Sequence, residues 1–270
     1  MVLAMLYRPL RVATFLAPSL LPVYAFVVRS LRARLGIAAE LCVGTSYDQL
    51  KEQVDVAFLC GLAYVELERR GEADLTPLAA PLLHGERYGA RPVYFSDVIV
   101  RRHSRFRSFA DLRGSSWAFN ELYSHSGYGV TRHHLLRLGE TNGYFDRVIE
   151  AGYHERSIQL VANGEVDASA IDSQVLAVEL RDRPDLRQQL RVIETLGPST
   201  IQPVVAARRL CRRLRADIQA ALVAVADEPG AGAILSRGFV ERFVAVQEND
   251  YDDLRAMRDA CLAASFMTFR

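Results

Sequence analysis

Residues 115–138 read SSWAFNELYSHSGYGVTRHHLLRL, and this stretch holds the pattern that decides the fold. Its first part, residues 115–120, is a short apolar run that predicts a buried strand. A turn of small polar residues follows, and we expect a helix from about Gly127 to Leu138. A strand, a turn and a helix in this order form the repeating unit of α/β proteins.

The same alternation extends outward in both directions. We expect further strands at residues 11–16, 40–43, 54–60, 78–83, 93–101, 145–151, 166–171, 191–195 and 204–207. We expect further helices at residues 22–35, 157–162 and 174–180, and a helical remainder after residue 207 with a break at Pro229-Gly230. The pattern predicts an α/β protein with mostly parallel sheets.

No low-complexity linker, charge block or repeat divides the chain. Two lobes would therefore have to be joined by strands that cross between them, and residues 91–93 and 197–202 are the candidates. We expect two α/β lobes with a ligand cleft between them. The first lobe would take residues 1–92 plus 203–270, and the second would take residues 93–202.

The composition excludes several classes of protein. The 270 residues include 33 basic and 32 acidic side chains, a net charge of +1, whereas nucleic-acid and membrane-surface proteins carry a large basic excess. The four cysteines are widely separated and show no metal-ligand spacing, so we interpret them as packing residues and expect no metal site.

The N-terminal region predicts neither export nor membrane insertion. No charged segment precedes the apolar residues 1–6, and strand-like sequence begins almost at once, which leaves little room for a signal peptide. Residues 12–28 approach the ~18 apolar residues of a membrane helix, but Pro18 and Pro22 interrupt them. We therefore expect the chain as written to remain in the compartment where it is made.

Enzyme signatures are absent from the sequence. The nearest match to a nucleophile elbow, residues 123–127, has Tyr123 in place of the first glycine. There is no Walker loop or dinucleotide fingerprint, and His154-Glu155 lacks the second histidine of a zinc motif. We expect no catalysis and no cofactor. An arginine cluster at residues 208, 209, 212, 213 and 215 is interpreted as a solvated helix face in preference to a docking patch.

Residues 120–128 offer the donors of an anion site. The first N–H groups of a helix lack intrahelical partners, and the helix dipole there favours negative charge. Ser124 and Ser126 add hydroxyl donors, and Gly127 allows a ligand to approach the backbone closely. The alternative is an ordinary helix with Ser126 as its N-cap, and this segment alone does not decide between the two.

A second pair of residues lies farther along the chain. His154 is expected between a strand and a helix start, where a ligand could meet it. Asp172 is expected at the carboxyl end of a strand, the edge that faces ligands in open α/β sheets. The alternatives are a capping histidine and a turn aspartate.

Four segments occur in an order and at separations that resemble a known family. They are Ser124-His-Ser-Gly-Tyr128, Gly152-Tyr-His-Glu155, residues 161–168 and Ile171-Asp-Ser173. This family comprises the phosphate, phosphite and phosphonate-binding subunits of ABC transporters, which have the type II periplasmic binding protein fold. Residues 46–50, 59–64 and 94–100 also look like that family, and the resemblance runs from about residue 10 to about residue 240.

The resemblance implies a role for each site residue. Tyr47 and Tyr94 would donate phenolic hydrogen bonds, His154 would close over the oxyanion, and Asp172 would face the other end of the ligand. The full set of candidate ligand-binding residues is Tyr47, Tyr94, Ser124, His125, Ser126, Gly127, His154 and Asp172. His125 and Tyr153 are bulkier than the small residues usual at these places, so the size of the ligand stays open.

The function implied is reversible binding of a small phosphonate, phosphite or phosphate by a monomer, with an ABC permease or a sensor protein as partner. Two alternatives remain: a cytoplasmic ligand-sensing homologue, and an enzyme on the same fold, similar to proteins of thiamine-pyrimidine biosynthesis. The enzyme would need an anchoring lysine or a cysteine cluster, whereas Lys51 is the only lysine and the cysteines are scattered.

Overall fold

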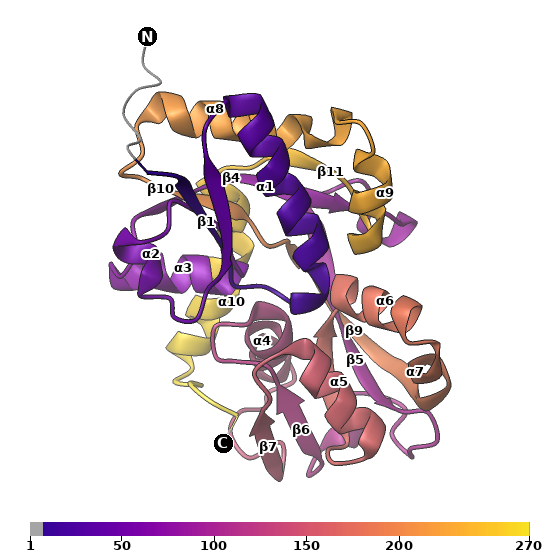
Figure 1. Cartoon of the computed structure of the whole chain (residues 1–270). Coiled ribbons are helices and arrows are strands. Elements are labelled where there is room, and N and C mark those ends of the chain that lie inside the picture. Colours follow the sequence, from indigo (N-terminus) through magenta and orange to yellow (C-terminus); the bar gives the residue numbers. More distant parts are fainter. Residues whose placement is uncertain (1–7, 270) are drawn as a thin grey trace. The chain divides into compact units, whose positions relative to one another are not determined.

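The computed structural model describes residues 8–269, which form two compact units, each with its own β-sheet (Figure 1). Unit 1 takes its described residues from Met1–Pro92 and Ile201–Tyr251. Unit 2 takes its described residues from Val93–Thr200 and Asp252–Arg270.

The chain passes from one unit to the other three times, after Pro92, Thr200 and Tyr251. The expected lobe division included only the first two passages and placed residues 252–270 in the first lobe. In the structure those residues belong to unit 2 because helix α10 (Asp252–Ala263) packs against α4 (Val130–Arg137) and β9 (Leu190–Thr200).

Unit 1 is built on a six-stranded sheet in the order β11-β4-β10-β3-β1-β2. Its strands are β1 (Leu10–Thr14), β2 (Ala39–Val43), β3 (Val56–Phe58), β4 (Leu75–Leu83), β10 (Val204–Ala207) and β11 (Val240–Ala245). Its helices are η1 (Pro18–Leu20), α1 (Leu21–Leu35), α2 (Gln49–Glu52), α3 (Gly61–Arg70), η2 (Glu86–Tyr88), α8 (Arg212–Val223), η5 (Ala224–Asp227), α9 (Ala231–Leu235), η6 (Ser236–Gly238) and η7 (Glu248–Tyr251).

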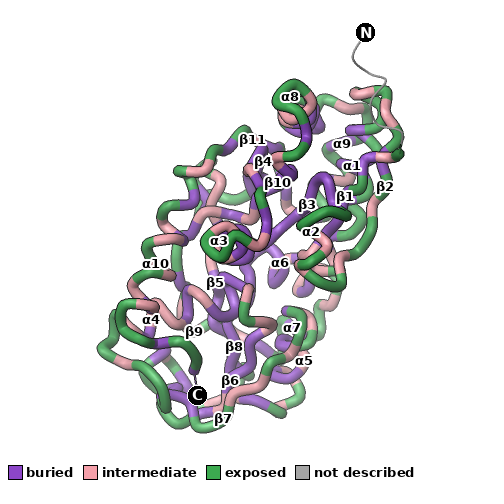
Figure 2. Tube along the Cα trace, turned by 90° about the vertical axis from the view of Figure 1, so that its left-hand side faces the viewer, coloured by how far each residue is buried: buried purple, intermediate pink, exposed green. Residues whose placement is uncertain are grey.

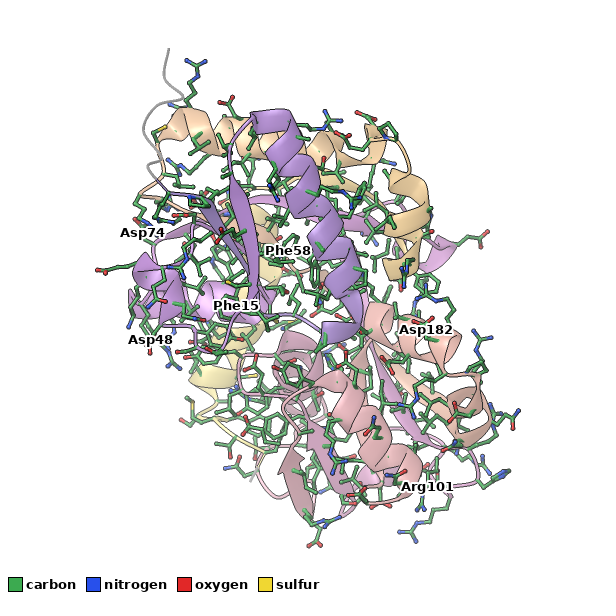
Figure 3. The ribbon with its side chains drawn as sticks, viewed as in Figure 1. Phe15, Asp48, Phe58, Asp74, Arg101 and Asp182 are labelled. Atoms are coloured by element: carbon green, nitrogen blue, oxygen red, sulfur yellow. The ribbon has the colours of Figure 1, made fainter. Side chains whose placement is uncertain are left out.

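Helix α1 shows how the apolar pattern builds unit 1. Val23, Val27 and Leu31 recur at helical spacing and are buried, so this face of α1 packs on the unit. The ring of Phe58 on β3 points toward α1 (Figure 3) and lies 4.5 Å from the ring of Tyr24. The helix ends at the residue that the sequence predicted as its stop, a glycine with a φ of +63°.

Unit 2 is built on a five-stranded sheet in the order β7-β6-β8-β5-β9. Its other strands are β5 (Val93–Arg101), β6 (Ser116–Phe119), β7 (Arg147–Glu150) and β8 (Ala168–Asp172). Its other helices are η3 (Ala110–Leu112), the π-helical turn η4 (His125–Gly129), α5 (His154–Asn163), α6 (Ser173–Asp182) and α7 (Pro184–Gln189).

The central strands of unit 2 are buried on both faces, as Figure 2 shows for β5, β6 and β8. Successive strand residues point to opposite faces, so Val98 and Ile99 belong to different clusters of the core, as do Trp117 and Ala118. The cluster around Trp117 includes residues of α4 and of the C-terminal segment, and the cluster around Ala118 includes residues of α5, α6 and α7. Helices thus cover both faces, the layering of a doubly wound α/β unit.

The prediction of mostly parallel sheets is wrong for the described strands. The pairs β1–β2, β1–β3, β6–β7 and β6–β8 are parallel. The pairs β10–β3, β10–β4, β11–β4, β5–β8 and β5–β9 are antiparallel. A short apolar run gives no strand direction, and the strands by which the chain enters each unit, β5 and β10, run against both of their neighbours.

Strand β11 lies where the sequence predicted helix. Val240 and Phe243 are buried while the two residues between them are exposed, a spacing that looks helical. The pairing with β4 shifts register between Val240 and Arg242. This β-bulge removes the strict alternation by which a strand is recognised.

Among the described residues, no single helix combines the length and apolar character needed to cross a membrane; the pair Arg212–Asp227 and Ala231–Gly238, bent by 95°, meets these criteria only jointly. The uncharged stretch at residues 12–28 is divided between β1, η1 and the start of α1. The apolar residues 1–6, on which the expectation about export rests, lie outside the described residues.

Candidate functional site

The turn after β6 carries the serines and the glycine that the sequence singled out. Ser124 is the N-cap of η4, and its Oγ accepts a hydrogen bond from the backbone N–H of Gly127 at 3.1 Å. The alternative interpretation of the sequence placed the cap at Ser126, two residues too late. The capping role of Ser124 leaves Ser126 inside the turn, with its hydroxyl available for another partner.

That partner is His154, the first residue of α5. The Oγ of Ser126 and the Nε2 of His154 are 2.8 Å apart, a hydrogen-bond distance. Both side chains are buried, with 3% and 7% of their surface exposed. The structure therefore brings together Ser126 and His154, the two residues that the sequence placed at two separate helix starts.

Burial also determines the charge of the two histidines in this region. Desolvation lowers the pKa of His154 to about 3, and desolvation together with His133 lowers the pKa of His125 to about 3. Both imidazoles are therefore neutral at physiological pH and offer one N–H donor and one ring acceptor each. A site made from them and from serines presents hydrogen-bond donors without a formal positive charge.

His125 is fixed by a residue that the sequence analysis did not name. Its Nε2 lies 2.9 Å from the Oγ of Ser199 on β9, and its ring centroid lies 6.4 Å from that of Tyr94. Tyr94 and Ser199 are paired across β5 and β9, and all three side chains are buried. Ser199 occupies the segment at residues 197–202 that we interpreted only as a crossing between lobes.

Gly127 is required by a close approach within the chain. A Cβ atom at this position would lie 2.0 Å from Oδ1 and 3.3 Å from the backbone N of Asn120, well inside van der Waals contact. The backbone carbonyl of Asn120 accepts a hydrogen bond from Gly152, so Asn120 also ties this turn to the loop before His154. The glycine thus allows the two loops of the site to pack together.

Asp172 lies at the carboxyl end of β8, as expected, and is the N-cap of α6. Its Oδ1 accepts hydrogen bonds from the backbone N–H groups of Gln174 at 2.7 Å and Val175 at 3.3 Å. Strand β8, which carries Asp172, and the turn η4 are in contact. The capping role agrees with the alternative interpretation of Asp172, and a role toward a ligand stays a prediction.

Tyr47 is the one candidate that belongs to unit 1. Its ring stacks on Phe15 with a centroid distance of 5.2 Å and an interplanar angle of 19°. Phe15 and Tyr47 follow the ends of β1 and β2, two neighbouring parallel strands, so they meet at the carboxyl edge of the sheet. The seven other candidates lie in unit 2, and a role of Tyr47 toward a ligand stays a prediction.

No group of three or more His, Cys, Asp or Glu side chains in residues 8–269 is placed to hold a metal ion.

Comparison with known sequences gives one family match. The family described as "ABC transporter, phosphonate, periplasmic substrate-binding protein" matches residues 14–251, most of the chain. The match includes both segments that carry the serines and His154.

Solved structures of other proteins share the fold of this chain. A binding-protein component of an ABC phosphonate transporter from Pseudomonas aeruginosa superposes with a TM-score of 0.80 at 17% identity, covering 93% of this chain and 85% of that one. PhnD1 from Prochlorococcus marinus, solved with methylphosphonate, gives 0.76 at 17% identity, covering 92% and 96%. XAC2383 from Xanthomonas citri, solved with ATP, gives 0.72 at 20% identity, covering 95% and 98%. At these identities the likeness shows the fold, and it confirms the expected two-lobed type II architecture.

Proposed function

Because the chain belongs to the family of periplasmic substrate-binding proteins of phosphonate ABC transporters, we propose that it reversibly binds one small phosphorus oxyanion at the Ser126–His154 pair of unit 2. Membership of this family, which we inferred from the sequence as a resemblance, is confirmed by the match to residues 14–251. Solute binding is the function of the family; the class of ligand and the residues that hold it are our proposal.

The 2.8 Å hydrogen bond between Ser126 and His154 is the observation that carries the proposal. A neutral imidazole has two tautomers. In one, Nε2–H donates to the Ser126 oxygen, and the Ser126 hydroxyl hydrogen is free to donate to a ligand. In the other, Ser126 donates to Nε2 and has no hydrogen left to offer. An oxyanion needs donors, so its binding selects the first tautomer.

The charges at the site fit a ligand held by neutral donors. None of the eight candidate residues carries a positive charge at neutral pH, because the pKa values of His125 and His154 are lowered to about 3. Hydrogen bonds from neutral donors to a charged oxygen contribute roughly 1.5–3 kcal/mol each. Several of them, together with the N–H groups at a helix start, are enough to hold a small anion.

The same geometry argues against catalysis by this pair. A serine beside a histidine resembles a nucleophile and its base, but an efficient general base has a pKa near the working pH. The pKa of His154 is lowered to about 3, and its Nδ1 is buried with no hydrogen-bond partner among residues 8–269. Among these residues, no carboxylate accepts a hydrogen bond from His154 Nδ1 to orient the imidazole, as a catalytic triad requires. We propose that the protein binds its ligand and releases it unchanged.

The family sets the partners. The substrate-binding protein of an ABC uptake system delivers a small ligand to a permease, and the family is periplasmic. We propose that this chain acts as a monomer with such a permease. The two alternatives considered from the sequence, a cytoplasmic sensor and an enzyme of the thiamine-pyrimidine type, are not favoured by the family match.

A thermal-shift screen tests the proposal. The ligands are phosphate, phosphite, methylphosphonate, 2-aminoethylphosphonate and sulfate, with ATP added because one structural relative was solved with it. A ligand present at about 100 times its Kd stabilises the folded protein by ~2.7 kcal/mol. We expect at least one phosphorus compound to raise the melting temperature and sulfate to raise it less. No shift with any phosphorus compound would contradict the proposal.

A further inference from the structure

The arginine cluster that the sequence analysis left as a solvated face separates into residues with different partners. Arg208 pairs with Asp74 at 3.0 Å and with Glu248. Asp74 projects from the periphery of unit 1 (Figure 3). Arg209 pairs with the buried Asp55 at 2.9 Å. These two arginines are structural, because they hold the segment between β10 and α8 to the residues that precede β3 and β4.

The three arginines on α8 are Arg212, Arg213 and Arg215, and Arg213 differs from the other two. Arg213 is 74% exposed and lies 4.0 Å from Asp217, one turn farther along the same helix. The guanidinium groups of Arg212 and Arg215 have no ion-pair or hydrogen-bond partner among residues 8–269, and the Nε of Arg215 is buried. A buried donor without an acceptor is costly, and two like charges one turn apart repel each other.

Arg212 and Arg215 line the same groove of unit 1, which has a volume of about 480 Å³. Its walls are formed by α8, by residues 76–78 of β4 and by residues 246–249 after β11. The carbonyl of Leu78 accepts hydrogen bonds from the Gln219 side chain at 2.7 Å and from the backbone N–H of Val246 at 3.1 Å, so the three walls are tied together. The volume is in the range of small-molecule sites, about 300–1,000 Å³.

The lining of the groove identifies the chemistry that fits it. Two unpaired guanidinium groups offer planar pairs of N–H donors, which match the oxygens of phosphate and carboxylate groups. The acidic residue in the lining, Glu248, is already paired with Arg208, so the groove keeps a positive charge. Pro77, Leu78 and Val246 add apolar surface beside the arginines.

We propose that this groove is a second binding site, separate from the Ser126–His154 pair, for an organic phosphate monoester. The dianionic phosphate head is held by Arg212 and Arg215, and a compact apolar body lies against Pro77, Leu78 and Val246. The site lies wholly within unit 1, whereas Ser126 and His154 lie in unit 2.

The test uses phenyl phosphate as the probe and nitrogen–proton correlation spectra of the full chain. We expect phenyl phosphate to shift the backbone signals of residues 76–78 and 246–249. In the double variant Arg212→Gln, Arg215→Gln, we expect the affinity for this site to fall by about 30-fold, the order expected when charge-assisted hydrogen bonds are lost. Arg213→Gln removes the same charge from the same helix outside the groove, and we expect less than a twofold change.

Two further probes separate the contributions to binding. Phenol, which has the ring without the charge, should not bind, and inorganic phosphate, which has the charge without the ring, should bind more weakly than phenyl phosphate. Equal losses in Arg213→Gln and in the double variant would overturn the proposal, because they would show unspecific attraction to a basic helix. No shifts at residues 76–78 and 246–249 would also overturn it. Methylphosphonate affinity should be unchanged in the double variant and in Arg213→Gln, so a failure of the oxyanion site would be recognised separately.

Discussion

Ser126→Ala is the substitution whose effects the structure defines most sharply. It removes the hydroxyl that lies 2.8 Å from His154 Nε2 in a buried environment. Two separate losses follow. The folded protein loses a buried hydrogen bond and leaves Nε2 without a partner beside an Nδ1 that already lacks one among the described residues. The proposed ligand loses a hydroxyl donor.

The two losses have different magnitudes and different readouts. Leaving a buried polar atom unsatisfied costs about 1–3 kcal/mol of unfolding free energy. The lost hydrogen bond to a charged ligand costs roughly 1.5–3 kcal/mol of binding free energy, which corresponds to a Kd about 10- to 100-fold higher. Trp117 is the only tryptophan and is buried in unit 2, so its fluorescence reports the unfolding of that unit in denaturant. Calorimetry with methylphosphonate measures the binding.

Ser169→Ala is the matched control. Ser169 is fully buried on β8 of the same unit, and its Oγ has no hydrogen-bond partner among residues 8–269. Removal of a hydroxyl that is already unsatisfied should not lower the stability, and it should leave the affinity unchanged within a few tenths of a kcal/mol. An unchanged Kd in folded Ser126→Ala, or equal losses in the two variants, would refute the reasoning.

Three further predictions follow from the same unit. Asp172→Asn keeps the N-cap of α6. Calorimetry should show weaker binding of 2-aminoethylphosphonate, by roughly 1.5–3 kcal/mol, and stronger binding of methylphosphonate. Equal weakening of both ligands would make Asp172 a purely structural cap. The pKa of the His154 imidazole is about 3 in the folded protein and 6.5 when the ring is exposed, so its contribution to stability is present above pH 6.5 and is lost as the pH falls toward 3. In His154→Asn, the fall in unfolding free energy over that pH range should be shallower by about 1.4 kcal/mol per pH unit. An unchanged slope would contradict the burial of a neutral imidazole. Tyr128→Phe removes a 2.5 Å hydrogen bond to the Met267 carbonyl that holds the C-terminal segment on η4, and it should speed amide hydrogen exchange at residues 127–130 several-fold. Tyr144→Phe removes a similar hydrogen bond elsewhere in unit 2 and should not speed exchange at these residues.

The sequence predicted most elements of unit 2 because these depend on local patterns. The apolar run before Asn120, the small polar turn and the helix after it are all local signals, and the structure contains them as β6, η4 and α4. The helix that begins at His154 was placed three residues too late, since a histidine is a weak helix-start signal.

Features that depend on distant residues were not predictable. The partner of His125, Ser199, is 74 residues away in sequence, and no local pattern links the two. The alternative interpretation assigned the cap to Ser126 because the sequence could not show that η4 begins two residues earlier with a π-helical turn. The return of residues 252–270 to unit 2 depends on packing of α10 against α4 and β9, which an amphipathic helix alone does not specify.

The central claim is that an oxyanion binds at the Ser126–His154 pair, and the ring nitrogens of His154 report on it most directly. In protein labelled with nitrogen-15 histidine, with the His154 signals assigned from a His154→Asn variant, methylphosphonate should be added at constant pH 7. We predict that the His154 signals shift saturably with one equivalent of bound ligand and retain a neutral ring with its proton on Nε2, the tautomer that leaves the Ser126 hydroxyl free to donate. Saturable binding of methylphosphonate that leaves the His154 signals unmoved would contradict the account.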